Sequence, residues 1–201
     1  MRPATQRLAA VDEANIVLDH AGQVNVFLVA GLLSNGGFVG PDGTPDFELL
    51  RSALRERIAE LPPLRKVPVA AGRRHRWDEV SPDLEHHVRL VEAVDGLAGL
   101  ERLCGELMSV PLGLDRPLWE ILIVPGASPG QVGVVLRIHH AVADGMAAVA
   151  ISQRLFDPSE PGLTPASVSS FHSPCRAQSK GHDATCGAFS EGSASACTAS
   201  G

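Results

Sequence analysis

Apolar residues recur along much of the chain with a helical period. The clearest example lies between Phe47 and Leu61, where apolar positions spaced by three and four residues share one face of a helix. Thr44 is predicted to cap this helix, with Pro45 at its first position, and Pro62 to end it. The same pattern predicts further helices over residues 5–19, over residues 95–109, and from just after His140 to about Phe156.

Runs of apolar residues with a strand-like pattern lie between these helices. They cover residues 24–33, 64–70, 73–80, 86–92, 118–124 and 131–138, and a turn at 125–130 separates the last two. Helices and strands that alternate in this way are most simply accommodated by an α/β fold, in which a mixed sheet is flanked by helices.

The composition changes abruptly at residue 157. After it, Ser, Ala, Gly and Thr dominate and large aliphatic residues nearly vanish, while three of the four cysteines appear. Such a segment buries too little apolar surface to offset the entropy of ordering it. We therefore expect a folded domain over residues 1–157 and a low-complexity, disordered tail over residues 158–201. Cys104 alone precedes the tail, so the folded part is not a disulfide scaffold.

Overall composition excludes several classes of protein. The chain has 201 residues, 44% of them apolar and 20% charged, which is typical of a globular domain. Its net charge of −6 argues against nucleic-acid binding, because few cations are present to neutralise phosphates. No stretch approaches the ~18–20 apolar residues of a membrane-spanning helix, and no signal-peptide core is evident near the N-terminus. We expect a cytoplasmic protein.

The segment RIHHAVADGM, residues 137–146, carries the strongest chemical signal. His139 and His140 follow an apolar strand, and Asp144 and Gly145 follow them at the start of the last predicted helix. A strand fixes such a group while its tip stays exposed. An imidazole with an ordinary pKa of about 6.5 is mostly neutral at pH 7 and accepts a proton from an alcohol. Asp144 is expected to hold the turn and Gly145 to allow close approach, so the pattern indicates attack by a hydroxyl or amine on an acyl carbon.

Other interpretations of the histidines remain open at this stage. The pair at 139–140 is also consistent with an ordinary loop that has no chemistry, or with a metal site shared with Asp144, although no third ligand lies nearby in sequence. His86 and His87 lie in a predicted alternating strand and are interpreted as structural. A zinc ion in the tail is a further alternative, with the ligands His172, Cys175, His182 and Cys186.

Several motifs resemble those of a known family. HHAVADG, residues 139–145, resembles the HHxxxDG motif of the coenzyme-A-dependent acyltransferase superfamily. PLGLDRPLWEILIV, residues 111–124, resembles the PLDxxRPLW segment of the bacterial wax ester synthase/diacylglycerol acyltransferase family. RLAAVDEANIVLD, residues 7–19, resembles the opening helix of that family, and LPPLRKV, residues 61–67, fits its next block. The resemblance covers about residues 5–157.

The resemblance implies a role for each residue of the motif. His140 would be the general base with His139 beside it, Asp144 would support the structure of the site, and Gly145 would permit a tight turn. The implied reaction transfers a fatty acyl group from acyl-CoA to diacylglycerol or a long-chain alcohol. Acyl-CoA would be a co-substrate, and neither a cofactor nor a metal is expected.

The resemblance also implies a partner and a substrate channel. Pro117, Leu118 and Trp119 match the PLW segment and are candidates for the channel, although positions in the strand core are an equally good interpretation. Members of the family have two similar halves with the active site between them, as in the chloramphenicol acetyltransferase fold, and this chain corresponds to the N-terminal half. We therefore expect a C-terminal half-domain as partner, and weak or no activity from the chain alone.

The apolar substrates place such an enzyme at the surface of a membrane or a lipid droplet. The alternatives are a half-domain that binds a partner without turnover, and another HHxxxDG acyltransferase of the condensation type.

Overall fold

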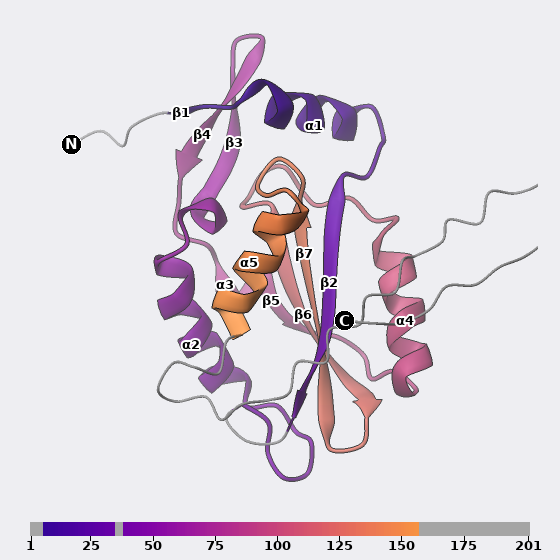
Figure 1. Ribbon diagram of the computed structural model, residues 1–201. Helices are drawn as coiled ribbons and strands as arrows, with labels where there is room; N and C mark the ends of the chain where they lie inside the picture. The colour runs from indigo at the N-terminus through magenta and orange to yellow at the C-terminus, as the bar shows by residue number, and fades with distance from the viewer. Residues whose placement is uncertain (1–5, 35–37, 157–201) are drawn as a thin grey trace, which may run out of the picture.

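The computed structural model describes residues 6–34 and 38–156, which form two β-sheets with helices packed on them (Figure 1). The larger sheet holds four strands in the order β2 (Val26–Ser34), β7 (Gln131–His139), β6 (Trp119–Ser128) and β5 (Val88–Leu90). β2 and β6 both run antiparallel to β7, and β5 runs parallel to β6. This mixed α/β arrangement confirms the fold class predicted from the sequence.

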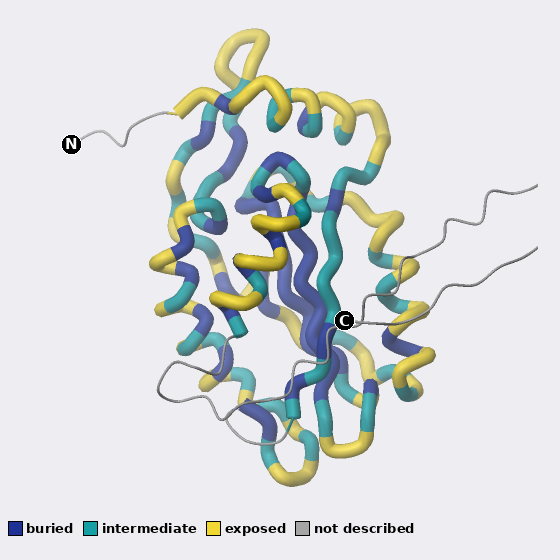
Figure 2. Tube along the Cα trace, in the orientation of Figure 1, coloured by how far each residue is buried: buried dark blue, intermediate teal, exposed yellow. Residues whose placement is uncertain are grey.

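β7 lies between β2 and β6 and forms the centre of the molecule. Val26 of β2 pairs with His139, and Ser34 pairs with Gln131, so the two strands match over their full length. Trp119 at the start of β6 pairs with Ile138. Figure 2 shows that the buried part of the chain is concentrated in these central strands. The end of β7 is therefore a fixed point in the fold.

Helices cover both faces of this sheet. α2 (Phe47–Ala59) and α5 (Gly145–Phe156) pack on one face, and α4 (Gly96–Leu107) packs on the other. Because successive side chains of a strand point to opposite faces, Val134 and Leu136 join the cluster beneath α2 and α5, whereas Val135 joins the cluster beneath α4. The sheet thus separates two hydrophobic layers.

A second, smaller sheet and a helix lie at the end of the main sheet where β7 finishes. The smaller sheet has the order β1 (Gln6–Arg7), β4 (Arg74–Glu79), β3 (Lys66–Ala71). α1 (Ala10–His20) lies across this end of the molecule, above the sheet in the view of Figure 1. A separate apolar cluster joins the two, and its buried members are Leu8, Ile16, Trp77, Leu118 and Ala141.

One buried group of charges lies in the main sheet. Glu120 of β6 and Arg137 of β7 are direct cross-strand partners, both buried, and they form an ion pair. The other carboxylate oxygen of Glu120 accepts a hydrogen bond from Arg89 at 2.5 Å. Two cations therefore share one buried anion.

Several details of the predicted elements were wrong. Residues 6–7, placed by the sequence pattern in the first helix, form β1, which pairs with β4, and α1 begins only at Ala10. The helix predicted to start at Thr44 and Pro45 begins after Asp46, because the Asp46 side chain accepts a hydrogen bond from the Leu49 N–H (3.0 Å) while Pro45 pairs with Val39 in an isolated bridge.

The predicted strand over residues 86–92 is divided. His86 and His87 belong to a short helix, α3 (Leu84–His87), because Asp83 caps it, and only Val88–Leu90 form a strand. After Leu61 the chain makes a 3-10 turn, η1 (Pro62–Arg65), before β3.

The other two errors concern strand and helix ends. β6 continues through the predicted turn at 125–130 to Ser128, with an irregularity in the register after Val124. The last helix begins at Gly145, and residues 140–142 form a turn. The predicted disorder of residues 158–201 lies outside the described residues.

Candidate active site

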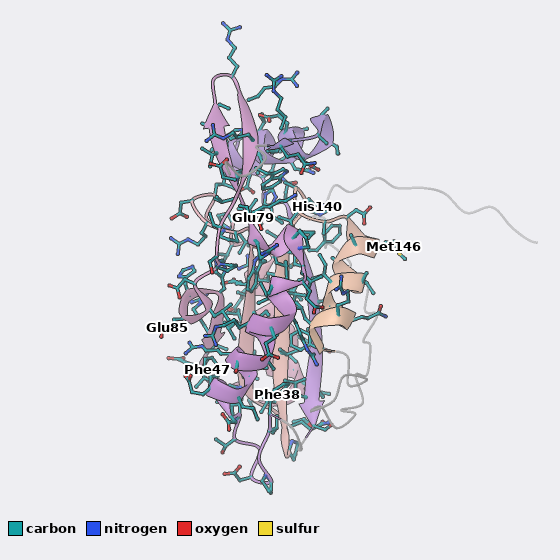
Figure 3. The ribbon with its side chains drawn as sticks, turned by 90° about the vertical axis from the view of Figure 1, so that its left-hand side faces the viewer. Phe38, Phe47, Glu79, Glu85, His140 and Met146 are labelled. Carbon is teal, nitrogen blue, oxygen red and sulfur yellow. The ribbon has the colours of Figure 1, made fainter. Side chains whose placement is uncertain are left out.

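The two histidines lie where β7 ends and the turn toward α5 begins. The N–H of His139 donates to the carbonyl of Leu118 (3.0 Å), and the N–H of His140 donates to the carbonyl of Asn25 (3.0 Å). The backbone at this junction is therefore held from both neighbouring segments of the sheet. Figure 3 shows His140 at this end, close to the start of α5.

His139 is completely buried and held in one orientation. Its Nδ1 accepts a hydrogen bond from the Ala141 N–H at 3.0 Å. A neutral imidazole that accepts at Nδ1 carries its proton on Nε2, and this atom lies 3.6 Å from Oδ1 of Asp19. Burial lowers the pKa of His139, although the nearby Asp19 carboxylate acts in the opposite direction. His139 is thus a neutral, internal group.

His140 is only half-buried. Its ring packs on the ring of Phe27, with centroids 3.6 Å apart and an angle of 34° between the planes. Burial lowers the pKa of His140 below its ordinary value of 6.5, so the ring is neutral at pH 7. Within residues 6–34 and 38–156, neither ring nitrogen of His140 makes a hydrogen bond. The ring is therefore free to accept a proton.

Asp144 and Gly145 form the start of α5. Oδ1 of Asp144 accepts from the Ala147 N–H at 2.8 Å, and the Asp144 carbonyl accepts from the Ala148 N–H at 2.8 Å. Asp144 is exposed and acts as a helix cap. This contact agrees with a supporting role.

Gly145 differs from the tight turn that the resemblance implied. It is the first residue of α5, and its backbone is outside the left-handed region that favours glycine. A Cβ added there would lie 3.5 Å from the Phe27 ring, which is an ordinary contact. An alanine side chain would therefore fit at this position without strain.

The three channel candidates have different positions. Leu118 is fully buried in the cluster beneath α1, and Trp119 is buried in the main core, where its Nε1 donates to the Leu64 carbonyl at 2.7 Å. Pro117 borders a surface hollow of about 300 Å³ that also includes His86. In the described part of the chain, Leu118 and Trp119 are core residues, and a channel role for the PLW segment stays a prediction.

His87, interpreted from the sequence as structural, is indeed part of the core. Its ring is buried, stacks on Trp119 with centroids 4.4 Å apart, and forms a hydrogen bond through Nδ1 to the Trp119 carbonyl at 2.7 Å. Burial lowers the pKa of His87.

Sequence reasoning did not identify three residues that contact the histidines. Asp19 and Asn25 contact His139 and His140, and Phe27 lies beneath the His140 ring. Asp19 comes from α1, Asn25 from the residue just before β2, and Phe27 from β2, all more than a hundred positions earlier in the chain. Asp19 is within the segment that resembles the family's opening helix, but no local pattern shows which distant residue an isolated acidic side chain will face.

The part of the chain that the structure describes offers neither a metal site nor a membrane-spanning helix. Residues 6–34 and 38–156 contain no group of three or more His, Cys, Asp or Glu side chains placed to hold a metal ion. The tail residues considered as zinc ligands, His172, Cys175, His182 and Cys186, lie outside the described residues. Among the helices described, none combines the length and apolarity needed to cross a bilayer.

Comparison with known families decides which group the chain joins. A family model described as "Wax ester synthase/diacylglycerol acyltransferase catalytic domain" matches residues 8–199. The chain belongs to this family. A Mycobacterium tuberculosis (strain H37Rv) relative, named as a candidate diacylglycerol O-acyltransferase, is 35% identical over 116 residues, which cover 55% of this chain and 25% of the relative. The chain matches only 25–30% of the length of the first such relatives.

Solved structures show the same fold. The wax ester synthase/diacylglycerol acyltransferase of Marinobacter aquaeolei VT8 superposes with a TM-score of 0.61 at 24% identity, over 80% of this chain and 41% of that one. A starter condensation domain of rhizomide synthetase, solved in complex with C8-CoA and Leu-SNAC, superposes with a TM-score of 0.56 at 20% identity, over 76% of this chain and 34% of that one. In both cases the match covers less than half of the solved chain.

Proposed function

We propose that this chain carries the catalytic base of an O-acyltransferase that moves a fatty acyl group from acyl-CoA to diacylglycerol or a long-chain alcohol. The observation that carries the proposal is the state of His140. Its ring is neutral, its nitrogens are unengaged within the described residues, and its backbone is fixed by Asn25. Membership of the wax ester synthase/diacylglycerol acyltransferase family supplies the reaction class.

The proposed reaction is a single displacement. His140 takes the hydroxyl proton of the acceptor while the acceptor oxygen attacks the thioester carbonyl carbon. The C–S bond then breaks, the ester is released, and the protonated His140 returns its proton to the departing CoA thiolate. General-base catalysis of this kind typically contributes about 10²–10⁴ in rate. His139 does not reach the reactants in this scheme, because it is buried behind the junction.

The substrate assignment rests on relatives. The curated relatives are named for diacylglycerol, the Marinobacter relative is named for wax esters as well, and one protein of the same fold was solved with C8-CoA. We propose acyl-CoA as co-substrate with no additional cofactor. Because both acceptors are lipids, we propose that the reaction takes place at the surface of a membrane or a lipid droplet. We also propose that the protein acts from the cytoplasm.

The active site as proposed requires a second half-domain. A channel that excludes water and binds an acyl chain needs walls on more than one side, and His140 lies at the end of a sheet on the surface of this half. We therefore propose the C-terminal half-domain of the family as the partner that completes the site, with the PLW segment, residues 117–119, near the channel.

A coupled assay tests the proposal. The purified chain is tested alone and mixed with the separately produced C-terminal half of the Marinobacter enzyme. Each sample is incubated with palmitoyl-CoA and either dioleoylglycerol or hexadecanol. The release of free CoA thiol and the formation of ester are both measured. We expect turnover with the second half present, and a loss of about 10²–10⁴ in His140→Ala.

The matched control is His86→Ala, since His86 is an exposed histidine of α3 that contacts Arg116 and, within the described residues, none of the junction residues 139–145. It should leave turnover unchanged. Equal turnover in His140→Ala and wild type would contradict the base assignment. Absence of ester under both conditions would favour a half-domain that binds a partner without turnover.

A further inference from the structure

One buried carboxyl group lies against the histidine pair and has no role in the reaction proposed above. The side chain of Asp19, near the end of α1, is only 4% exposed. Its Oδ1 lies 3.6 Å from Nε2 of His139 and 3.4 Å from the backbone N of Asn25, which donates to it. Burial of a carboxyl group costs free energy unless the group is paired. The contacts of Asp19 must therefore offset this cost.

Asp19 is held at this position by the rest of α1. Ile16, one turn earlier, is fully buried in the cluster that contains Leu118 and Ala141. Glu13, a further turn earlier, accepts a hydrogen bond from the His75 backbone at 2.9 Å and contacts the His75 ring at 2.8 Å. The helix therefore presents Asp19 to the histidine junction from a rigid base.

Asp19 supports the tautomer of His139 that the Ala141 contact requires. The Ala141 N–H donates to Nδ1, so the ring proton belongs on Nε2. Among the described residues this buried nitrogen forms no hydrogen bond, and its ion-pair contact is with Oδ1 of Asp19 at 3.6 Å. Without the carboxylate, the Nε2 proton would also lose this contact with a negative charge. The ring would then gain by rotating or by moving its proton, and either change disturbs the Ala141 turn.

A second contact extends the influence of Asp19 to His140. Asn25 donates its N–H to Asp19 and accepts the His140 N–H at its carbonyl (3.0 Å). The Asn25 side chain donates to the Asn15 carbonyl at 3.3 Å, which ties the same segment back to α1. The Asp19 carboxylate therefore contacts the ring of His139 and, through Asn25, restrains the backbone of His140.

We propose that Asp19 is the positioning residue of the histidine pair: it fixes the Nε2–H tautomer of His139 and, through Asn25, the location of His140. The proposal rests on the proposed function for its catalytic consequence, but its structural part does not require turnover.

Nuclear magnetic resonance on the full chain with ¹⁵N-labelled histidine tests the structural part. Two-bond proton–nitrogen correlations at pH 7.5 report which ring nitrogen of each histidine carries the proton. We expect wild-type His139 to be protonated on Nε2. Asp19→Ala should convert His139 to a mixture of tautomers and shift the signals of His140, whereas Asp19→Asn, which retains an acceptor oxygen, should preserve the wild-type tautomer.

The control is Asp12→Ala, which removes an acidic side chain from the first turn of the same helix and should leave both histidines unchanged. A His139 tautomer that is the same in wild type and Asp19→Ala would overturn the proposal. So would protonation on Nδ1 in the wild type, a measurement that needs no folded variant.

Turnover tests the catalytic part. In the reconstituted assay, Asp19→Ala should lower kcat by about 10- to 100-fold with little change in KM, because orientation of the base is lost while substrate binding is not. Asp19→Asn should recover most of kcat. If no variant and no wild-type chain turns over, the proposed function fails while the tautomer result still decides the role of Asp19; equal kcat in Asp19→Ala and wild type would overturn the positioning role.

Discussion

Two adjacent histidines have different environments because they occupy the last position of a strand and the first of a turn. His139 points into the protein, where its Nδ1 accepts from the Ala141 N–H and its Nε2 lies 3.6 Å from the Asp19 carboxylate without forming a hydrogen bond. His140 is half-buried on Phe27, with nitrogens that are unengaged within residues 6–34 and 38–156. The proposed division between an internal support and a proton acceptor follows from this difference in burial and partners.

The pH dependence of turnover should report the environment of His140. Because burial lowers its pKa, the neutral base persists below pH 6.5, and kcat/KM should fall only at lower pH. Phe27→Ala removes the ring that covers one side of His140 and should return the pKa toward its ordinary value, which moves the acid limb to higher pH. Profiles between about pH 5 and pH 8 measure this.

A suitable control for that profile is Phe47→Ala, since Phe47 lies on α2 and packs against the same core without touching the histidine. Its acid limb should match the wild type. If the acid limb of the kcat/KM profile stayed in place or moved to lower pH in Phe27→Ala, the Phe27 ring would not set the pKa of His140.

At the scale of single elements, the boundaries of helices depend on which side chain caps them. Asp46 and Asp144 each accept a hydrogen bond from the backbone three residues later and set the starts of α2 and α5. The sequence pattern predicted both helices but placed the start of one at Thr44 and the other directly after His140. Apolar spacing locates the face of a helix well, whereas its first residue depends on competition between nearby polar side chains.

Removal of the helix cap at Asp144 should lower the stability of the protein and should not act directly on the reaction. Asp144→Ala should lower the free energy of unfolding by about 1 kcal/mol, the typical value of an N-cap, and Asp144→Asn should restore it because an amide oxygen also accepts the Ala147 N–H. Urea unfolding measures both variants. If Asp144→Ala abolished turnover while stability stayed at the wild-type level, Asp144 would have a direct chemical role.

The buried charges on β6 and β7 should contribute more to the free energy of unfolding than the helix cap does. Glu120 is the buried anion shared by Arg137 and Arg89, so Glu120→Ala leaves Arg137 buried without its anion. We expect a loss of about 3–5 kcal/mol in the free energy of unfolding, again from urea titration.

Glu79→Ala is the matched control for this variant, because it removes the same side chain from the end of β4, where Glu79 pairs with Arg65 at the surface. It should cost below about 1 kcal/mol. Similar losses in the two variants would contradict the special position of Glu120.

For the whole molecule, the sequence was sufficient to predict the α/β class and most elements, because the periods of Phe47–Leu61 and of the two long strands reflect burial directly. The histidine junction was also predictable, since His139, His140 and Asp144 are neighbours in sequence. Asp19, Asn25 and Phe27 were not, because their proximity to the pair arises only when β2 aligns with β7. The positions of Leu118 and Trp119 likewise depend on tertiary packing and not on local pattern.

Stability should depend on pH in one direction. Burial lowers the pKa of His87 and His139, and both are buried. The unfolded chain therefore binds protons at higher pH than the folded chain. Above pH 7 these groups carry no penalty, and as pH falls below their unfolded pKa of about 6.5 the folded state loses stability by roughly 1–2 kcal/mol per pH unit.

Urea unfolding at several pH values between about 5 and 8 measures this slope. His87→Gln should reduce it, since the group that must stay neutral is gone. A stability that is flat or rises toward low pH would contradict the neutral state of the two buried rings.

The full-length pairing of β2 with β7 also governs the order of events during synthesis. The two strands are about 100 positions apart, so β2 leaves the ribosome long before its partner exists. Contacts this remote raise the contact order, which slows folding, and a growing chain must keep an apolar strand from aggregating in the meantime. The hydrogen bonds that hold His139 to Leu118 and His140 to Asn25 are therefore among the last features to form. Chaperones that shield the early strand should increase the yield of folded protein.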